Sequence, residues 1–471
     1  MSIRQFLFKS FILPSSFFLL TFSVACAADP QIGSVSFDLN KDNRLATIRY
    51  ELAGAPGIVT LDVQTNRTGA ATAVDEDWVS IGGEHLREVV GDVNRYVEDL
   101  GEHILLWQPD KSWPDHEVPA GAIRAVVTAW STQTPPNYLV VDIVNPSNRW
   151  FYTDEAFLPR GGITNDYYRQ QSIVMRKIPA AGVKWTMGTA NVSGVTVLSN
   201  TQQHYVKLTN DYYMGVFELT IGQVRKFASV EWVKGYINSL HVTDSLKQVK
   251  AFQHYLKFDN GDTNNCPAGE MSHAFLRSSA SDAASVWPAA RHWVDPKSWL
   301  GRLRAKTGVD FDLPTEAQWE FAARAGTGTL TPLGNFTASS VPLRDANLKP
   351  VAWYDETVGG SSNGKLHRVG TKMANGFGLY DMIGNIDECC LDWYAADYGI
   401  GSADVETTVF QEPEGPATGS GRSYRGGYCL YSYTAMYTAS RHEHLQWYGA
   451  RLMCPVGLLF PDAEKATPVS E

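Results

Sequence analysis

The chain has 471 residues, of which 44% are hydrophobic and 19% are charged. This composition excludes a disordered protein, and the length is sufficient for about two or three domains. The formal net charge of −10 argues against a nucleic-acid partner, because nucleic acid is bound by clustered Lys and Arg side chains that neutralise phosphates.

Residues 1–28 are typical of a secretory signal peptide. Arg4 and Lys9 precede an apolar run from Phe11 to Val24, and small residues follow at Ala25 to Ala28, the order found in export signals that are removed. The run is short and is interrupted by a proline and two serines, and no later segment approaches the length of a membrane span. We therefore predict an exported protein, periplasmic or extracellular, with no transmembrane segment.

The cysteines raise two further questions. Ser23 stands where a lipoprotein signal usually has a leucine, whereas Ala25-Cys26-Ala27 suits ordinary cleavage; lipid anchoring at Cys26 is the alternative. Removal of the signal leaves an odd number of cysteines, so at least one thiol stays unpaired within the chain. We interpret Cys389 and Cys390 as buried free thiols that pack as small apolar groups, rather than as a strained vicinal disulfide.

Residues 30–145 are predicted to form an all-β, immunoglobulin-like or fibronectin-like sandwich. Apolar and polar residues alternate in LATIRYEL (45–52) and IVTLDV (58–63), and turn sequences separate such runs at regular spacing. Trp107 and Trp130 are interpreted as core residues. A proline-rich connector follows at residues 146–170, and a second domain at 171–460 precedes a tail at 461–471.

Several segments of the second domain carry recognisable motifs. In LPTEAQWEFAARAG (313–326), Thr315 is predicted to cap a helix that ends at Gly326. In YYMGVFELTIGQVRKFA (212–228), Thr220 is placed to cap another helix. The remaining motifs are NGFGLYDMIGNIDECCLDWY (375–394), YRGGYCLY (424–431) and YGARLM (448–453).

Taken in this order, the segments resemble the formylglycine-generating enzyme family, also called the sulfatase-modifying factor family. The resemblance covers roughly residues 170–457 and leaves the predicted sandwich outside. It implies an α+β domain of the C-type-lectin-like kind with little regular secondary structure.

The resemblance also implies a chemistry that this sequence does not support. Members that generate formylglycine oxidise a cysteine of sulfatases with oxygen and a copper ion, which two cysteine thiolates hold because soft Cu(I) prefers sulfur. In the family these cysteines follow the second glycine of the RGG-type motif by four and nine residues, which correspond here to Tyr431 and Met436. Cys429 lies only two residues past Gly427. We therefore do not expect copper-dependent formylglycine generation.

Two alternatives remain for the stretch RGGYCLYSYTAMYTASRHEH (425–444). His442 and His444 would share one face of a strand and, with Cys429, are candidates for a remodelled copper or iron site; otherwise they line a cleft as polar side chains. Aromatic residues of the same region are candidates for the floor of a cleft that binds protein or glycan, or for core packing: Tyr428, Tyr431, Tyr433 and Trp447.

A structural calcium site is a further implication of the resemblance. The family's ligands map onto Asp381, Gly384, Ile386 and Glu388, and hard oxygen ligands from a tight loop suit Ca²⁺; the alternative is that the two acids are solvated. Arg425 and Arg451 are interpreted as buried residues that bond carboxylates or carbonyls. We predict a binding module for protein or glycan, with an oxidase using His442 and His444 as the alternative.

Overall fold

In this computed structural model most of the chain has a defined position. The residues described are 28–66, 68–69, 74–119, 121–189, 200–227, 257–258, 263–269, 271–277, 294–337, 345–354, 365–401, 403–429, 436–443 and 449–459. Within these ranges no helix has the length and apolar character required to cross a bilayer.

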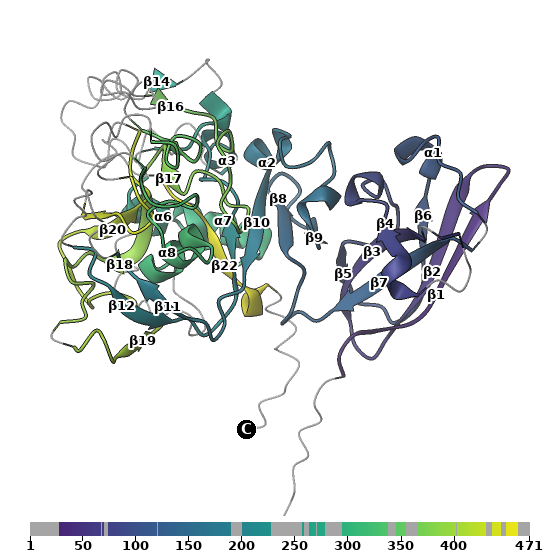
Figure 1. Cartoon of the computed structure of the whole chain (residues 1–471), viewed down its shortest axis with the longest axis horizontal. Helices are drawn as coiled ribbons and strands as arrows, with labels where there is room; N and C mark the ends of the chain where they lie inside the picture. Colours follow the sequence, from purple (N-terminus) through teal and green to yellow (C-terminus); the bar gives the residue numbers. More distant parts are fainter. Residues whose placement is uncertain are drawn as a thin grey trace, which may run out of the picture.

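The amino-terminal region consists of two antiparallel sheets around one core (Figure 1). One sheet contains β1 (Gln31–Asn40), β2 (Leu45–Ala53) and β6 (Gly101–Trp107), and the other contains β3 (Gly57–Asn66), β4 (Trp78–Ser80), β5 (Arg95–Val97) and β7 (Ile123–Trp130). Alternate residues of β2 are buried, as the period of two in its sequence predicts. Trp107 fills this core. The predicted β-rich amino-terminal region is therefore confirmed.

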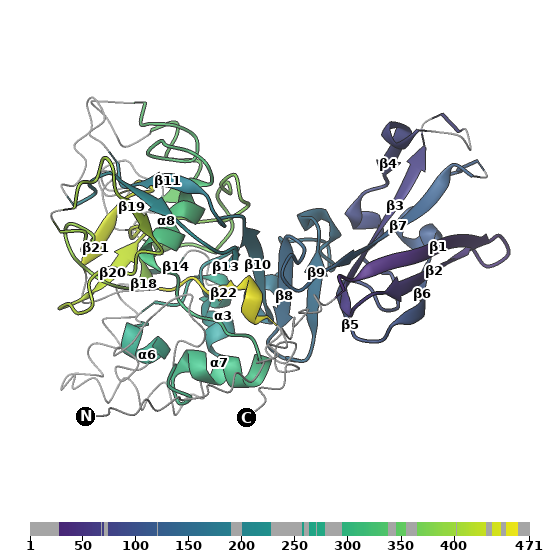
Figure 2. The ribbon, with the colours of Figure 1, turned by 90° about the horizontal axis from the view of Figure 1, so that it is seen from below.

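A five-stranded antiparallel sheet follows the amino-terminal region. Its order is β22 (Met453–Pro455), β13 (Tyr212–Gly215), β10 (Ser172–Ile178), β8 (Tyr138–Asp142) and β9 (Arg149–Tyr152). Seen from below, β8 and β9 lie between the amino-terminal sheets and the rest of the chain (Figure 2). The predicted boundaries differ from this arrangement, because β8 falls within the range assigned to the sandwich, and β9 falls within the range assigned to the connector.

The boundary differs because β8 has the sequence of a fully buried strand. All five of its residues are buried, and such a continuous apolar run is typical of a strand inside a covered sheet rather than of a half-exposed sandwich strand. The boundary between the two regions therefore lies earlier than predicted, at Pro135 and Pro136, just before β8 begins.

The two regions share packing across β9. Ile58 of β3 belongs to the same apolar cluster as Phe151 of β9, and this cluster continues into the second domain. The Arg149 guanidinium of β9 donates hydrogen bonds to the carbonyl oxygens of Thr307 and Leu459. Therefore β9 joins the amino-terminal sheets to the body of the second domain.

The second domain has short elements joined by long loops, which confirms the prediction of a mixed α/β domain with little regular structure. One three-stranded sheet contains β11 (Lys184–Met187), β12 (His204–Lys207) and β19 (Val409–Gln411), and another contains β18 (Glu388–Trp393), β20 (Arg422–Arg425) and β21 (Arg441–Glu443). Two-stranded sheets are formed by β14 (Lys257–Phe258) with β16 (Lys365–Leu366) and by β15 (Ala352–Trp353) with β17 (Ile383–Gly384). The described α-helices of the whole chain are α1 (Pro109–Ser112), which lies in the amino-terminal region, and α2 (Tyr167–Gln170), α3 (Ile221–Val224), α6 (His273–Arg277), α7 (Trp299–Thr307) and α8 (Glu316–Arg324).

Helices α3 and α8 begin at the predicted caps. Thr220 and Thr315 each accept a hydrogen bond from a backbone N–H one turn into the helix, and a glutamine at the third helical position bonds back to the cap in both cases. This reciprocal arrangement satisfies two backbone donors that the helix itself leaves unpaired. Helix α8 ends where Ala325 and Gly326 adopt positive φ angles. Its capped start fixes the position of two glutamates described below.

Candidate functional site

The RGG stretch leaves β20 through two glycines in the left-handed region. Gly426 and Gly427 have φ angles of 94° and 86°, which glycine adopts without steric cost. The Gly427 N–H donates to Asp387 Oδ1 at 3.0 Å, and the Cys429 N–H donates to the Asn385 carbonyl oxygen at 3.0 Å. The backbone of the stretch is therefore held against the loop that precedes β18.

Cys429 and Tyr428 lie in the core. Cys429 is fully buried, Tyr428 is 5% exposed, and both pack with Leu366 and Ile386. Tyr428 therefore acts as a core residue in this structure and does not form an open floor for a ligand. The other residues of the predicted cleft and the second histidine lie outside the described residues: Tyr431, Tyr433, His444 and Trp447.

His442 lies on β21, opposite Tyr424 of β20. Its Nε2 atom is 3.0 Å from the hydroxyl oxygen of Ser440, and the side chain is half-buried. In the part of the chain that the structure describes, no three His, Cys, Asp or Glu side chains gather as potential metal ligands.

The two sulfur-bearing residues of the stretch belong to separate apolar clusters. Met436, which the sequence analysis predicts to stand in place of a copper-binding cysteine, is fully buried with Val351, Tyr354 and Ile383. Cys429 belongs to the other cluster, around Ile386 and Leu366. Each sulfur is thus surrounded by its own apolar neighbours.

Behind the RGG stretch, α8 presents two buried glutamates to arginines of β20 and β21. Glu316 Oε1 lies 2.9 Å from Arg425 Nε and 2.6 Å from Arg441 Nε. Glu320 Oε2 lies 2.6 Å from Arg425 Nη2. Burial by itself would raise the pKa of Glu316, but Arg441 and Arg425 outweigh it, so the pKa of Glu316 is lowered. The predicted role of Arg425 in bonding buried carboxylates is confirmed.

Asp392 adds a third carboxyl group to this network. Its Oδ2 atom accepts a hydrogen bond from the Glu316 backbone N–H at 2.7 Å. Burial, and then the negative charge of Glu316, raise the pKa of Asp392 to about 8. The raised pKa of Asp392 favours its protonated form, which adds no further negative charge to the interior.

The loop predicted to hold calcium contains a carboxylate that already has a cationic partner. Glu388 accepts hydrogen bonds from Arg451, with Arg451 Nη2 at 2.6 Å from Oε1, and from Trp319 Nε1 at 2.5 Å from Oε2. Arg451 also donates to the carbonyl oxygens of Gly215 and Val216, which confirms its predicted buried role. As arranged here, Glu388 does not fit a calcium ion, because the cation would lie beside a guanidinium group.

The remaining groups of this loop lie near Glu218. Asp381 Oδ2 accepts from the Gly370 N–H at 2.6 Å, whereas Asp381 Oδ1 is buried and has no hydrogen-bond partner among the described residues. Glu218 accepts from Asn385 Nδ2 and from the Ile386 N–H. Burial raises the pKa of Asp381 to about 6, and burial, Asp381 and Glu388 raise that of Glu218 well above its usual value. Calcium binding by Asp381, Gly384 and Ile386 stays a prediction.

Comparison with known proteins places these features in a family. The model of the sulfatase-modifying factor enzyme 1-like domain matches residues 174–452, which is more than half of the chain. The chain belongs to this family.

Several curated relatives match the sulfatase-modifying factor domain. The formylglycine-generating enzyme of Streptomyces coelicolor is 34% identical over 52% of this chain and 76% of its own length. That of Thermomonospora curvata is 30% identical over 35% of this chain and 54% of its own length. The serine/threonine-protein kinase pkn1 of Chlamydia caviae is 33% identical over 29% of this chain. The chain spans about half of the Thermomonospora relative and about a fifth of the kinase.

Two solved structures overlap the domain weakly. Treponema denticola variable protein 1 is 22% identical, covers 60% of this chain and 95% of its own, and gives a TM-score of 0.41. PvdO from Pseudomonas aeruginosa is 18% identical, covers 60% of this chain and 94% of its own, and gives a TM-score of 0.36. These scores are too low for an inference about function.

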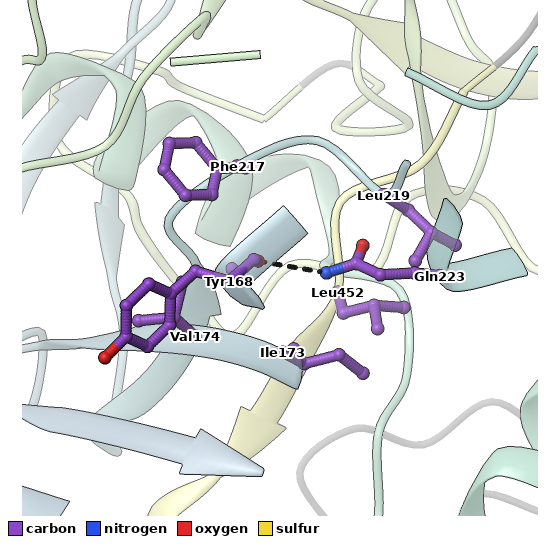
Figure 3. Close-up of a pocket in the computed structure, with 8 residues that line it drawn as sticks. Tyr168, Ile173, Val174, Phe217, Leu219, Gln223 and Leu452 are labelled. Carbon is purple, nitrogen blue, oxygen red and sulfur yellow. Dashed lines mark hydrogen bonds between the residues drawn. The ribbon is translucent and has the colours of Figure 1, made fainter. Parts of the chain in front are cut away.

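A small cavity inside the sulfatase-modifying factor domain is not a substrate site. Its volume is about 10 Å³, and Phe217, Leu219 and Leu452 are among its walls. Gln223 Nε2 donates to the Tyr168 carbonyl oxygen across it at 3.3 Å (Figure 3). Such a space holds about one water molecule.

Sequence reasoning missed four buried acidic residues of this domain. Glu218, Glu316, Glu320 and Asp392 are all buried, although charged side chains are mostly exposed. One available signal was the spacing of Glu316 and Glu320, four residues apart on one helix face beside apolar Trp319.

Proposed function

We propose that this protein is an exported member of the sulfatase-modifying factor family that binds a protein or glycan and lacks the copper-dependent oxidation of cysteine. The proposed binding role is supported by the presence of a second, β-rich region beside the family domain in the same chain. Family membership alone does not fix function, because one fold carries several functions.

A single observation carries the proposal: the two sulfurs of the RGG stretch lie in different apolar clusters. A copper ion that is held by two thiolates needs both sulfurs at one point. Here the residue at the second position is the thioether Met436, buried around Ile383, and the thiol of Cys429 is buried around Ile386. A thiol enclosed by apolar side chains is a poor nucleophile and a poor metal ligand.

The alternative function is an oxidase with a metal bound by His442 and His444. His442 is half-buried on β21 beside Ser440, so its imidazole is in part accessible to a metal ion from solution.

Metal analysis of the purified protein separates these functions. The chain is loaded with Cu(I) or Fe(II) under anaerobic conditions, desalted and assayed for bound metal, beside the double variant H442A/H444A. We expect substoichiometric metal in both proteins. One equivalent in the wild type that the double variant loses would establish the oxidase-type site and reject the proposal.

A further inference from the structure

A cavity of about 490 Å³ lies where the amino-terminal sheets meet β8, β9 and α2. This volume is in the range of sites for small molecules. One wall contains residues 87–91 and 93–95, which precede or begin β5. The other contains residues of β8, β9 and the segment that follows β9: Val140, Trp150, Tyr152, Pro159, Arg160, Tyr167 and Tyr168. Both views place β9 between β5 and β8 (Figures 1 and 2). None of the described residues that line the cavity comes from the RGG stretch.

The cavity walls carry more positive than negative charge. Arg87, Arg95 and Arg160 line it, together with one acid, Glu88. Arg95 has a carboxylate partner, since its Nη1 atom lies 3.7 Å from Asp92 Oδ1. Arg87 and Arg160 form no ion pair within the described part of the chain. An arginine without a carboxylate partner can offer its planar set of N–H donors to a ligand anion.

Arg87 and Arg160 reach the same segment from opposite walls. A Cβ atom added at Gly162 would lie 3.2 Å from Arg87 Nη2, so this guanidinium reaches across to the segment that contains Arg160. Arg160 stacks over the Tyr167 ring at 4.1 Å. Both guanidinium groups therefore lie beside the segment from Arg160 to Tyr168. Burial raises the pKa of the nearby Tyr168, and the charges of Arg160 and Arg87 both act against this rise.

Strand β9 supplies an aromatic surface with free donors. Trp150 and Tyr152 are two residues apart on this edge strand and both line the cavity, as residues on one face of a strand do. Neither the Trp150 indole N–H nor the Tyr152 hydroxyl bonds to another described residue. Aromatic side chains of this kind give contact area to a ligand while their polar ends direct it.

The cavity walls are held in place by hydrogen bonds that cross between the two regions. The Phe151 N–H of β9 donates to the Asn94 carbonyl oxygen at 2.7 Å, and Arg87 Nε donates to the Ala156 carbonyl oxygen at 3.2 Å. On the other wall, Asn165 Nδ2 donates to the Arg160 carbonyl oxygen at 2.7 Å. A ligand would thus meet walls that are already positioned, which lowers the entropic cost of binding.

We propose that this cavity binds an anionic sugar, one whose carboxylate or sulfate group pairs with Arg87 and Arg160 while its ring rests against Trp150 and Tyr152. The acid Glu88 and the Asn94 amide provide acceptors for sugar hydroxyl groups. This inference goes beyond the proposed function, because it assigns a site outside the RGG stretch and would stand if that stretch proved to be catalytic.

Isothermal titration calorimetry on the full mature chain tests the proposal with four probes. Glucuronic acid and N-acetylglucosamine 6-sulfate carry both the ring and the anion, glucose carries only the ring, and sodium sulfate carries only the anion. We expect the first two to bind about tenfold or more tightly than the last two, with an affinity that falls as NaCl is added.

Variants locate the binding. R160Q and R87Q should each weaken binding of the two acidic sugars about tenfold, whereas R44Q, which removes an exposed arginine in the turn between β1 and β2, should leave it unchanged. Because Arg160 is exposed, R160Q alone decides the matter if R87Q fails to fold. The proposal is overturned if neither acidic sugar binds, if glucose or sulfate binds as tightly, or if R160Q binds like the wild type. Copper binding, measured separately, does not enter this result.

Discussion

Arg451 and Glu388 form a buried ion pair in which Nη2 and Oε1 are 2.6 Å apart and neither side chain is more than 1% exposed. The pair joins the chain segment before β22 to the first residue of β18. Five further hydrogen bonds hold Arg451 in place: its Nε donates to both carboxylate oxygens of Glu388, and its Nη atoms donate to the carbonyl oxygens of Gly215, Val216 and Tyr380.

Removal of Arg451 should destabilise the protein strongly. R451A leaves the Glu388 carboxylate buried without its cation, which typically costs about 3–5 kcal/mol. The matched control is R49A, since Arg49 pairs with Glu102 at the surface and such pairs contribute about 0–1 kcal/mol. Urea unfolding followed by tryptophan fluorescence measures both. If R451A and R49A lost the same free energy of unfolding, the buried ion pair would contribute no more to stability than the surface pair.

Calcium should stabilise the protein through Asp381. Its Oδ1 atom is buried and has no hydrogen-bond partner among the described residues, so it can serve as a hard oxygen ligand. We expect the unfolding midpoint to be higher in calcium than in EGTA, because an ion that binds only the folded state stabilises it. Differential scanning calorimetry makes this comparison, with D381N as a parallel sample in which the difference should disappear. Equal midpoints of the wild type in calcium and in EGTA would contradict the predicted site.

The protonated carboxyl group of Asp392 should make stability depend on pH. Its pKa is raised to about 8 in the folded protein, against about 3.9 in an unfolded chain. Between these two pKa values the Asp392 carboxyl group is protonated in the folded protein and ionised in the unfolded chain. The stability that this proton contributes is therefore complete below about pH 4 and is lost as the pH rises towards 8.

The variant D392N isolates this effect. Its stability relative to the wild type should rise with pH across this window, with a slope of at most about 1.4 kcal/mol per pH unit. Urea unfolding at a series of pH values from 5 to 9 gives the comparison. A difference that stays constant with pH would contradict a raised pKa for Asp392.

The thiols of the folded protein should be unreactive. Cys266, Cys389, Cys390, Cys429 and Cys454 are all buried and form no disulfide bond with one another in the described part of the chain, and burial raises the pKa of Cys390 and of Cys454. We expect 5,5′-dithiobis(2-nitrobenzoic acid) to label these five cysteines slowly in buffer and fully in guanidinium chloride. Fast labelling of Cys429 in buffer, identified by mass spectrometry, would show that the RGG stretch presents a thiolate after all.

Local patterns predicted the parts of the fold that depend on neighbouring residues. The caps of α3 and α8 follow from Thr220 and Thr315 three residues before a glutamine, and alternation in β2 follows from its period of two. The place of β8 could not be read in this way, because a buried apolar run does not reveal which sheet it joins. Pairing of β8 with β10 depends on contacts between distant parts of the sequence.

For the candidate site, the sequence predicted the family but few of the side-chain contacts. The set of motifs, with the helix at 313–326 and the segment at 375–394 among them, indicated the family, and Arg425 and Arg451 were recognised as buried. That Tyr428 packs in the core, and that Arg451 takes up Glu388, follow from side-chain packing between segments far apart in the chain. The cavity at β9 was missed because its two walls come from regions interpreted as separate domains.

Aldehyde formation on a sulfatase-derived cysteine peptide tests the central claim most directly. The purified, copper-loaded protein is incubated with the peptide and oxygen, beside the formylglycine-generating enzyme of Streptomyces coelicolor, and the product is identified by mass spectrometry. We predict unchanged peptide with this protein and aldehyde with the relative. Catalytic conversion of the peptide by this protein would contradict the conclusion that Cys429 and Met436 do not form a copper site.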